Sequence, residues 1–149
     1  MSSLRVAKRY AKSLFDLAKE QSALDEVYAD MDFFLKICKE NHTLELMLKS
    51  PVIPGDKKKK ILELIFEDKF HTLSIAIIDI IIRKKIQSIF LEIAQAFMDL
   101  YNEEKDILTA TLITAKPFSE TLIKEITYTL SQQTGSQIKI DKKIDNELL

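Results

Sequence analysis

The sequence has few of the residues that build metal or redox sites. Cys38 is the only cysteine, so an intrachain disulfide and a thiolate cage for a metal are both excluded. With so little cysteine, the composition fits a reducing compartment. His42 and His71 are the only histidines and stand 29 positions apart, and although His42 follows Cys38 by four positions, two such side chains fall short of the three or four protein ligands of a zinc site. We therefore predict structural or surface roles for both.

Glycine is equally scarce, and this scarcity bears on catalysis. Gly55 and Gly135 are the only two glycines and lie far apart, whereas a phosphate-binding loop needs closely spaced glycines that let backbone N–H groups approach the phosphates. A nucleotide-binding loop of that kind is excluded. No convergent nucleophile, base and orienting group can be recognised either. We expect a protein that is not an enzyme and that uses no metal or cofactor.

The chain also lacks an excess of charge and a long hydrophobic run. Its 22 basic and 23 acidic residues leave a formal charge of -1, so no global field favours nucleic acid or an anionic membrane. The basic residues near the amino terminus are followed at once by acidic ones, without the apolar stretch of a signal peptide. Residues 75–82 are apolar except for Asp79 but fall short of the roughly 20 residues of a membrane span. We expect a soluble, unprocessed protein.

Hydrophobic residues, by contrast, are plentiful at 46%, and before Asp106 they recur at the spacing of amphipathic helices. We expect Asp56 to cap the fourth helix and Asp79 to face outward or to pair with Arg83 at i+4. No glycine or proline separates the fifth and sixth helices. The expected helices cover residues 4–18, 24–38, 44–48, 57–66, 75–82 and 86–101.

After Asp106 the pattern changes to that of a small mixed element. Residues 107–114 are rich in β-branched side chains, Ser119 can cap a helix, and Gly135 suits its left-handed end. A second strand follows over 138–144. The fold class is therefore mainly α: a bundle of about six helices in residues 1–105, then a small, incomplete β-α-β piece in residues 106–149. Two strands and a helix bury too little surface to be stable alone.

Two basic clusters need an interpretation. We predict that the run Lys57 to Lys60 is a solvated first helical turn, because the whole chain lacks basic excess. For the same reason we predict that the basic residues of the first helix form its solvent-facing side: Arg5, Lys8, Arg9 and Lys12. A helical RNA-binding regulator is the alternative function, and strong salt-dependent binding to RNA would favour it. A small enzyme of unrecognised type is a weaker rival. Cys38 reads as a small buried hydrophobe.

Apolar surface is the feature that points to a partner. The apolar face of the first helix covers roughly half its circumference, more than one packing contact needs, and residues 75–82 are apolar nearly all round. The excess could form a groove that accepts an amphipathic partner helix. The residues alone slightly favour the simpler alternative, in which both helices are central in the bundle.

The order of elements and three segments resemble the delta subunits of F-type ATP synthases, called the oligomycin-sensitivity-conferring protein in mitochondria. Residues 6–18 resemble the opening helix of that family, with its Ala-x-x-Tyr-Ala-x-x-Leu-Phe-x-x-Ala pattern, and residues 50–53 resemble its mid-bundle turn. The stretch from Ile138 to Leu148 resembles the first half of its carboxyl-terminal signature. That signature continues into a Gly-Gly pair and closing strands, which we expect to be missing because the sequence stops at Leu149. At 83–85 the chain has Arg-Lys-Lys where many members carry an Asn-Gly-Arg type sequence.

The resemblance implies a role as well as a fold. It implies a non-catalytic peripheral-stalk subunit that links the catalytic head to the b-subunit stalk and resists rotor torque, on the cytoplasmic face of the bacterial inner membrane and without inserting into it. Residues 1–105 would bind the amino-terminal helix of an alpha subunit through the first and fifth helices, and residues 106–149 would meet the b subunits. The residues expected at the alpha-subunit site are Tyr10, Ala11, Leu14, Phe15, Ile77, Ile80 and Ile81.

Overall fold

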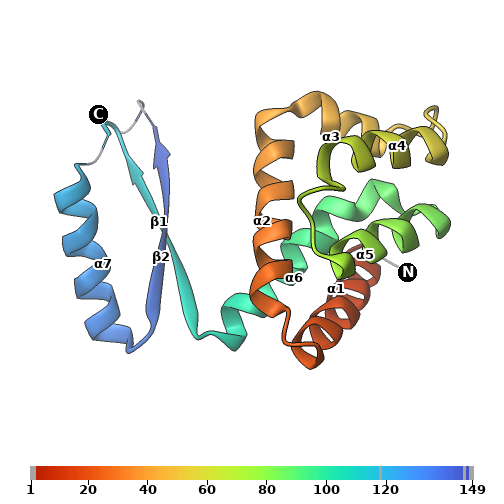
Figure 1. Cartoon of the computed structure of the whole chain (residues 1–149). Coiled ribbons are helices and arrows are strands. Elements are labelled where there is room, and N and C mark those ends of the chain that lie inside the picture. Colours follow the sequence, from red (N-terminus) through yellow and green to blue (C-terminus); the bar gives the residue numbers. More distant parts are fainter. Residues whose placement is uncertain (1–2, 118, 146, 148–149) are drawn as a thin grey trace. The chain divides into compact units, whose positions relative to one another are not determined.

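The computed structural model describes residues 3–117, 119–145 and 147 (Figure 1). The chain divides into two compact units, Met1–Tyr101 and Asn102–Leu149, which we call unit 1 and unit 2. Together they give the mainly α fold, with a small sheet in unit 2, that the sequence predicts. The helices assigned to unit 1 are α1 (Ser3–Glu20), α2 (Leu24–Glu40), α3 (His42–Lys49), α4 (Gly55–Phe66), α5 (Thr72–Arg83), the short 3-10 helix η1 (Gln87–Ile89) and α6 (Phe90–Glu104), whose last turn enters unit 2.

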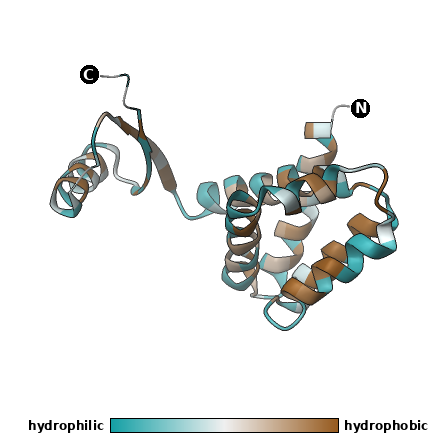
Figure 2. Ribbon diagram, turned by 90° about the horizontal axis from the view of Figure 1, so that it is seen from above, coloured by the Kyte–Doolittle hydropathy of each residue, from teal (hydrophilic) through white to brown (hydrophobic). Residues whose placement is uncertain are grey.

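The core of unit 1 forms where the apolar stripes of these helices meet. Helix α1 packs on α2, α5 and η1, and α4 packs on α5. Figure 2 shows brown and teal alternating within the turns of the bundle helices, as one apolar face per helix requires. Phe34 of α2 contacts Phe66 of α4, with ring centroids 5.8 Å apart, and stacks on Phe90 of α6 at 4.0 Å. These rings tie helices that are distant in the sequence into one core.

Helices α5 and α6 are separate, and the break follows from backbone hydrogen bonding. Lys85 lies in the left-handed region with φ 58°. Its N–H donates to the Ile82 carbonyl, and the Ile86 N–H donates to the Ile81 carbonyl, both at 3.1 Å. This pair of bonds is the Schellman arrangement, which ends a helix and redirects the chain. The sequence alone did not reveal this break, because glycine is the usual left-handed residue there.

Unit 2 is a β-α-β element made of β1 (Ile107–Thr114), α7 (Glu120–Thr134) and β2 (Gln137–Ile144). The strands pair in parallel, from Ile107 opposite Gln137 to Thr114 opposite Ile144. As predicted, Ser119 caps α7, since its hydroxyl accepts the Leu122 N–H at 3.2 Å. Gly135 ends the helix at φ 71°. Leu148 of the predicted tail signature lies outside the described residues.

Two polar residues of α4 differ from the sequence-based expectations, and Asp79 of α5 meets one of its two alternatives. Asp56 does not cap α4, because the helix already begins at Gly55, and Pro54 holds the capping position without a side-chain bond. Lys58 is buried rather than solvated, and its ammonium donates to the Leu48 carbonyl at 3.0 Å and to the Ser50 carbonyl at 2.7 Å. The side chain of Asp79 is 46% exposed, in agreement with the expectation that it faces outward, and its ion pair is with Lys59 of α4 at 2.7 Å and not with Arg83. The partners of Lys58, at the end of α3 and in the turn after it, and the partner of Asp79, on α4, belong to other segments of the chain, which local spacing cannot reveal.

Candidate partner-binding face

The first helix positions four of the seven residues expected at the alpha-subunit site. Ala11, Leu14 and Phe15 are buried within unit 1, whereas Tyr10 is half-buried beside them. Helical spacing puts Tyr10 on one flank of this stripe with Val6 and Leu17. Leu17 is 41% exposed, so this flank keeps apolar surface that unit 1 does not cover.

The fifth helix positions the other three residues. Ile77 and Ile81 are buried in the core, and Ile80 is half-buried. Asp79 faces α4 through its ion pair with Lys59, and Ile75 and Ile78 line a small pocket with that same lysine. At 100° per residue Ile80 lies on the flank of α5 away from α4.

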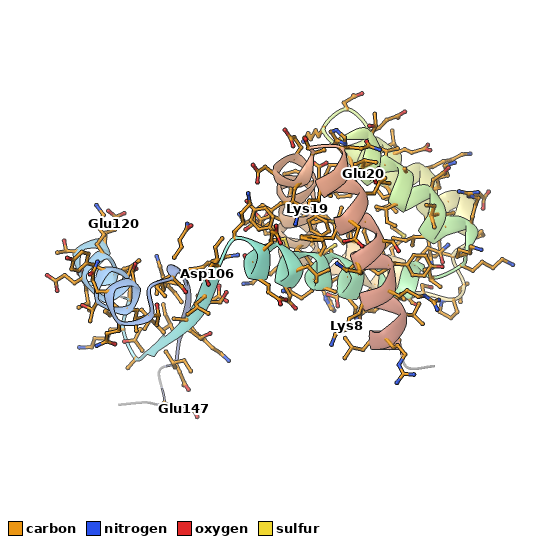
Figure 3. All side chains as sticks on the ribbon, turned by 90° about the horizontal axis from the view of Figure 1, so that it is seen from below. Lys8, Lys19, Glu20, Asp106, Glu120 and Glu147 are labelled. Atoms are coloured by element: carbon orange, nitrogen blue, oxygen red, sulfur yellow. The ribbon has the colours of Figure 1, made fainter. Side chains whose placement is uncertain are left out.

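The flank of α1 that carries Tyr10 and the flank of α5 that carries Ile80 lie on the same side of α1. Figure 3 shows Lys8 and Lys19 projecting from the side of α1 on which α6 lies, with the green α5 on the other side. The ring contact between Phe15 and Phe97, at 6.0 Å, also places α6 against the Lys8 side of α1. Because Tyr10 lies across the helix from Lys8, its flank is turned toward α5, which packs on α1. We call the surface formed by Val6, Tyr10, Leu17 and Ile80 the α1–α5 face.

Only part of the predicted set is therefore accessible on the free chain. Tyr10 and Ile80 lie on the α1–α5 face, and Arg9 sits over the Tyr10 ring with its guanidinium carbon 5.7 Å from the centroid. The five buried members hold α1 and α5 in the core beneath that face. The role of all seven residues in partner binding stays a prediction.

Asp30 and Ser74 fix the start of α5 and were missed by sequence reasoning. One oxygen of the buried Asp30 carboxylate accepts the His71 N–H and the Ser74 hydroxyl, each at 2.7 Å. His71 in turn caps α5, since its Nδ1 accepts the Leu73 N–H at 3.1 Å. A signal was present: Asp30 stands one position before Met31, on the apolar stripe of α2. The carboxylate and the imidazole thus satisfy N–H groups that a helix start leaves free.

The other side chains considered as candidate functional groups have the surroundings of ordinary core or surface residues. Cys38 is buried, and burial raises the pKa of its thiol to about 11, so the thiol stays protonated. His42 is exposed, with its Nδ1 3.5 Å from the Glu45 carboxylate. On α1, Lys12 pairs with Asp16 at 2.8 Å. Within the described ranges, no three His, Cys, Asp or Glu side chains are grouped so that they can hold a metal ion.

Unit 2 presents a second candidate face, on α7. None of its described residues is buried, and Leu122 and Tyr128 are 40% and 67% exposed. A shallow hollow of about 280 Å³ lies along α7. Its lining residues are spaced along one side of the helix: Leu122, Glu125, Ile126, Thr129 and Leu130.

Comparisons with known proteins agree with this architecture. The ATP synthase delta subunit of Cytophaga hutchinsonii is 34% identical over 149 residues, which cover all of this chain and 81% of that protein. The delta subunit of Chlorobaculum tepidum is 32% identical over 149 residues, again all of this chain and 82% of the relative. The chloroplastic delta chain of Chlamydomonas reinhardtii is 34% identical over 146 residues, covering 97% of this chain and 67% of its own.

A solved structure extends the likeness to three dimensions. A chain in the cryo-electron-microscopy structure of the Toxoplasma gondii mitochondrial ATP synthase hexamer superposes with a TM-score of 0.77 at 27% identity, covering 93% of this chain and 78% of that one. The family model described as ATP synthase delta (OSCP) subunit matches residues 6–149, nearly the whole sequence. With the helical bundle, the β-α-β unit and these matches in agreement, the chain belongs to the ATP synthase delta (OSCP) subunit family.

Proposed function

We propose that this protein is a non-catalytic peripheral-stalk subunit of an F-type proton-translocating ATP synthase. It links the alpha/beta catalytic head to the b-subunit stalk and resists the torque of the rotor. Membership of the delta (OSCP) family supports this role. The observation that carries it is the presence of two separate units, each with its own uncovered apolar side chains, because a linker between two bodies needs two contact surfaces.

Unit 1 is the part that binds the head. The amino-terminal helix of the alpha subunit lies along the α1–α5 face, with Tyr10 and Ile80 as anchors on either flank. A tyrosine suits such a position because its ring can cover a partner helix while its hydroxyl stays in water. The five buried residues of the predicted set lie in the core under this face and fix the distance between α1 and α5: Ala11, Leu14, Phe15, Ile77 and Ile81.

Unit 2 is the part that binds the b-subunit stalk. Its lack of buried residues among those described and the row of apolar side chains along α7 support this assignment, since exposed apolar surface of this kind marks interaction sites. The protein then lies peripherally at the cytoplasmic face of the bacterial inner membrane. None of the helices in the described part of the chain combines the length and apolar character that crossing a membrane requires.

Calorimetric titration with a synthetic alpha-subunit amino-terminal helix tests the head contact. We expect Tyr10→Ala to weaken binding by about 1 to 3 kcal/mol, the range of an interface anchor, with a small change in melting temperature. Leu14→Ala should chiefly lower stability, by about 2 to 4 kcal/mol, because this side chain is buried. Tyr128→Ala, which removes an exposed tyrosine from unit 2, is the matched control and should leave the affinity unchanged.

Ile80→Asp gives a second measure of the same face. A carboxylate on this half-buried flank should abolish binding of the helix, because it would be desolvated against apolar groups. Asp79→Asn, one residue away but turned toward α4, should bind normally. Wild-type affinity in both Tyr10→Ala and Ile80→Asp would show that the alpha-subunit helix does not use the α1–α5 face.

A further inference from the structure

The fold brings two basic segments together at one end of the bundle. A side-chain carbon placed on Gly55, the first residue of α4, would lie 3.1 Å from Gln87 Nε2 and 3.7 Å from an Ile82 methyl group. The start of α4 is therefore packed against the end of α5. Arg83 also acts electrostatically on the ion pair between Lys59 and Asp79. The lysine run 57–60 and the run 83–85 thus share one end of unit 1, which we call the basic end.

The charge at the basic end is not neutralised by the fold. Segments 55–63 and 79–85 contain seven basic and three acidic side chains, although the whole chain has a formal charge of -1. Lys57, Lys60, Lys84 and Lys85 are exposed. None of these four forms an ion pair within the described part of the chain. At physiological salt, charges are screened beyond about 8 Å. These lysines therefore attract a ligand only when it is in contact with the surface.

Lys85, one of these lysines, occupies a backbone conformation that is unfavourable for a residue with a side chain. It holds the left-handed position that ends α5, where a residue with a Cβ is disfavoured and glycine fits best. Ser22 ends α1 in the same way: it has φ 54° and donates to Lys19 at 3.2 Å, while Ala23 donates to Ala18 at 2.8 Å. Because Ser22 and Asp106 adopt the same left-handed conformation, this strain alone assigns no function to Lys85, and the case for a site rests on the charge and the apolar side chains around it.

Apolar side chains accompany these cations. Val52, in the turn that leads into α4, is 85% exposed, and Ile53, Ile82 and Ile86 are half-buried. A surface that combines unpaired lysines with apolar anchors fits a ligand with the same two characters. RNA or a membrane surface fits less well, because each extends beyond the basic end and meets the net negative charge of the rest of the chain.

We propose that the basic end docks an acidic amphipathic segment of a protein partner. Glutamate or aspartate side chains of that segment pair with Lys57, Lys60, Lys84 and Lys85, and its apolar side chains cover Val52. This docking does not depend on the α1–α5 face, so either proposal can fail without the other.

The probe is a fluorescent amphipathic helical peptide with glutamates on one face and leucines on the other. Its affinity for the full chain is measured by anisotropy at a series of salt concentrations, beside the same peptide with glutamine in place of glutamate. We expect binding of the glutamate peptide that weakens as salt rises, and at least tenfold weaker binding of the glutamine peptide. Lys84→Glu should weaken binding of the glutamate peptide about tenfold. Lys124→Glu, the same change at an exposed position on α7, should not.

Lys85→Gly distinguishes a loss of charge from a loss of stability, because it removes a cation and at the same time relieves backbone strain. We expect it to weaken binding about threefold while raising the melting temperature by about 2 to 6 °C, since glycine relieves the left-handed residue. Ser22→Gly should raise the melting temperature similarly and leave the affinity unchanged. The proposal is overturned if Lys84→Glu and Lys85→Gly bind normally, or if the glutamine peptide binds as well as the glutamate peptide. It is equally overturned if single-stranded RNA or phosphatidylglycerol vesicles bind more tightly than the glutamate peptide at physiological salt.

Discussion

Replacing Asp30 by alanine tests whether a buried carboxylate fixes the start of α5. Asp30 is 8% exposed, and one of its oxygens accepts two hydrogen bonds, from the His71 N–H and the Ser74 hydroxyl, each at 2.7 Å. Both distances are short, as expected for bonds to a charged acceptor. Asp30→Ala removes both bonds and leaves two donors facing a methyl group.

The magnitude follows from these two contacts. A hydrogen bond to a charged group contributes about 1.5 to 3 kcal/mol, and an unsatisfied buried donor adds its own desolvation cost. Ser74 can recover part of the loss by donating to a carbonyl in its own helix turn. We therefore expect Asp30→Ala to lower the free energy of unfolding by about 3 kcal/mol, against the 5 to 15 kcal/mol typical of a domain. Asp30→Asn keeps a carbonyl acceptor and should cost about half as much.

The control is two residues away on the same helix. Asp32 pairs with Lys36 at 2.8 Å on the surface, and such a pair contributes about 0 to 1 kcal/mol. Urea denaturation followed by circular dichroism gives the free energies of Asp30→Ala and Asp32→Ala. Amide hydrogen exchange at Leu73 and Ile75 shows whether the loss is centred on the first turn of α5.

The outcome that would refute this reasoning is specific. If Asp30→Ala destabilises the chain no more than Asp32→Ala does, the buried carboxylate does not fix α5. A double-mutant cycle with Ser74→Ala adds a second criterion, because two directly bonded groups should show a coupling energy of about 1 to 2 kcal/mol. Additive effects would indicate that the hydroxyl and the carboxylate act independently.

Three further perturbations have defined outcomes. Lys58→Met should lower stability by about 2 kcal/mol, because two carbonyls lose a charged donor; Lys60→Met, exposed on the same helix, should be neutral in the same urea titration. The contribution of Cys38 to stability should be constant below about pH 9 and fall as pH rises from 9 toward 11, because burial raises the pKa of its thiol from 9.0 to about 11 and the unfolded thiol ionises first; Cys38→Ala should therefore reduce the slope of stability against pH between about pH 9 and 10. Tyr101→Phe should lower stability by about 1 kcal/mol through loss of its 2.9 Å bond to Asp25, a change that unchanged urea midpoints would rule out.

Local patterns in the sequence predicted the helices, the strands and the caps of α7, because these depend on neighbours within a turn or two. The structure confirms the buried state of Cys38, a structural role for His71, which caps α5, and the left-handed Gly135. Contacts between distant segments could not be predicted in this way. Asp30 and His71 are 41 positions apart, and local spacing indicates nothing about such a pair.

The lysine run shows the same limit in one place. Four identical residues in a row carry no signal that separates them, yet their positions around α4 give them different surroundings. Lys58 enters the core and donates to carbonyls at the end of α3, Lys59 reaches Asp79 on α5, and Lys57 and Lys60 face solvent. Burial lowers the pKa of Lys58, whereas the carboxylate of Asp79 raises that of Lys59. The direction that each residue faces, rather than its type, determines its role.

The absence of buried residues among the described part of unit 2 has an energetic consequence for the proposed stalk contact. Burial of apolar surface is the main favourable contribution to folding, at about 25 cal/mol per Å², and unit 1 obtains it from a core that includes Phe34, Phe66 and Phe90. The described residues of unit 2 have only half-buried and exposed side chains with which to offset the entropy of ordering its backbone. A partner that covers Leu122 and its neighbours on α7 then stabilises unit 2 by the free energy of binding to the folded form. If the stalk binds there, as proposed, folding of unit 2 and attachment to the stalk form one linked equilibrium.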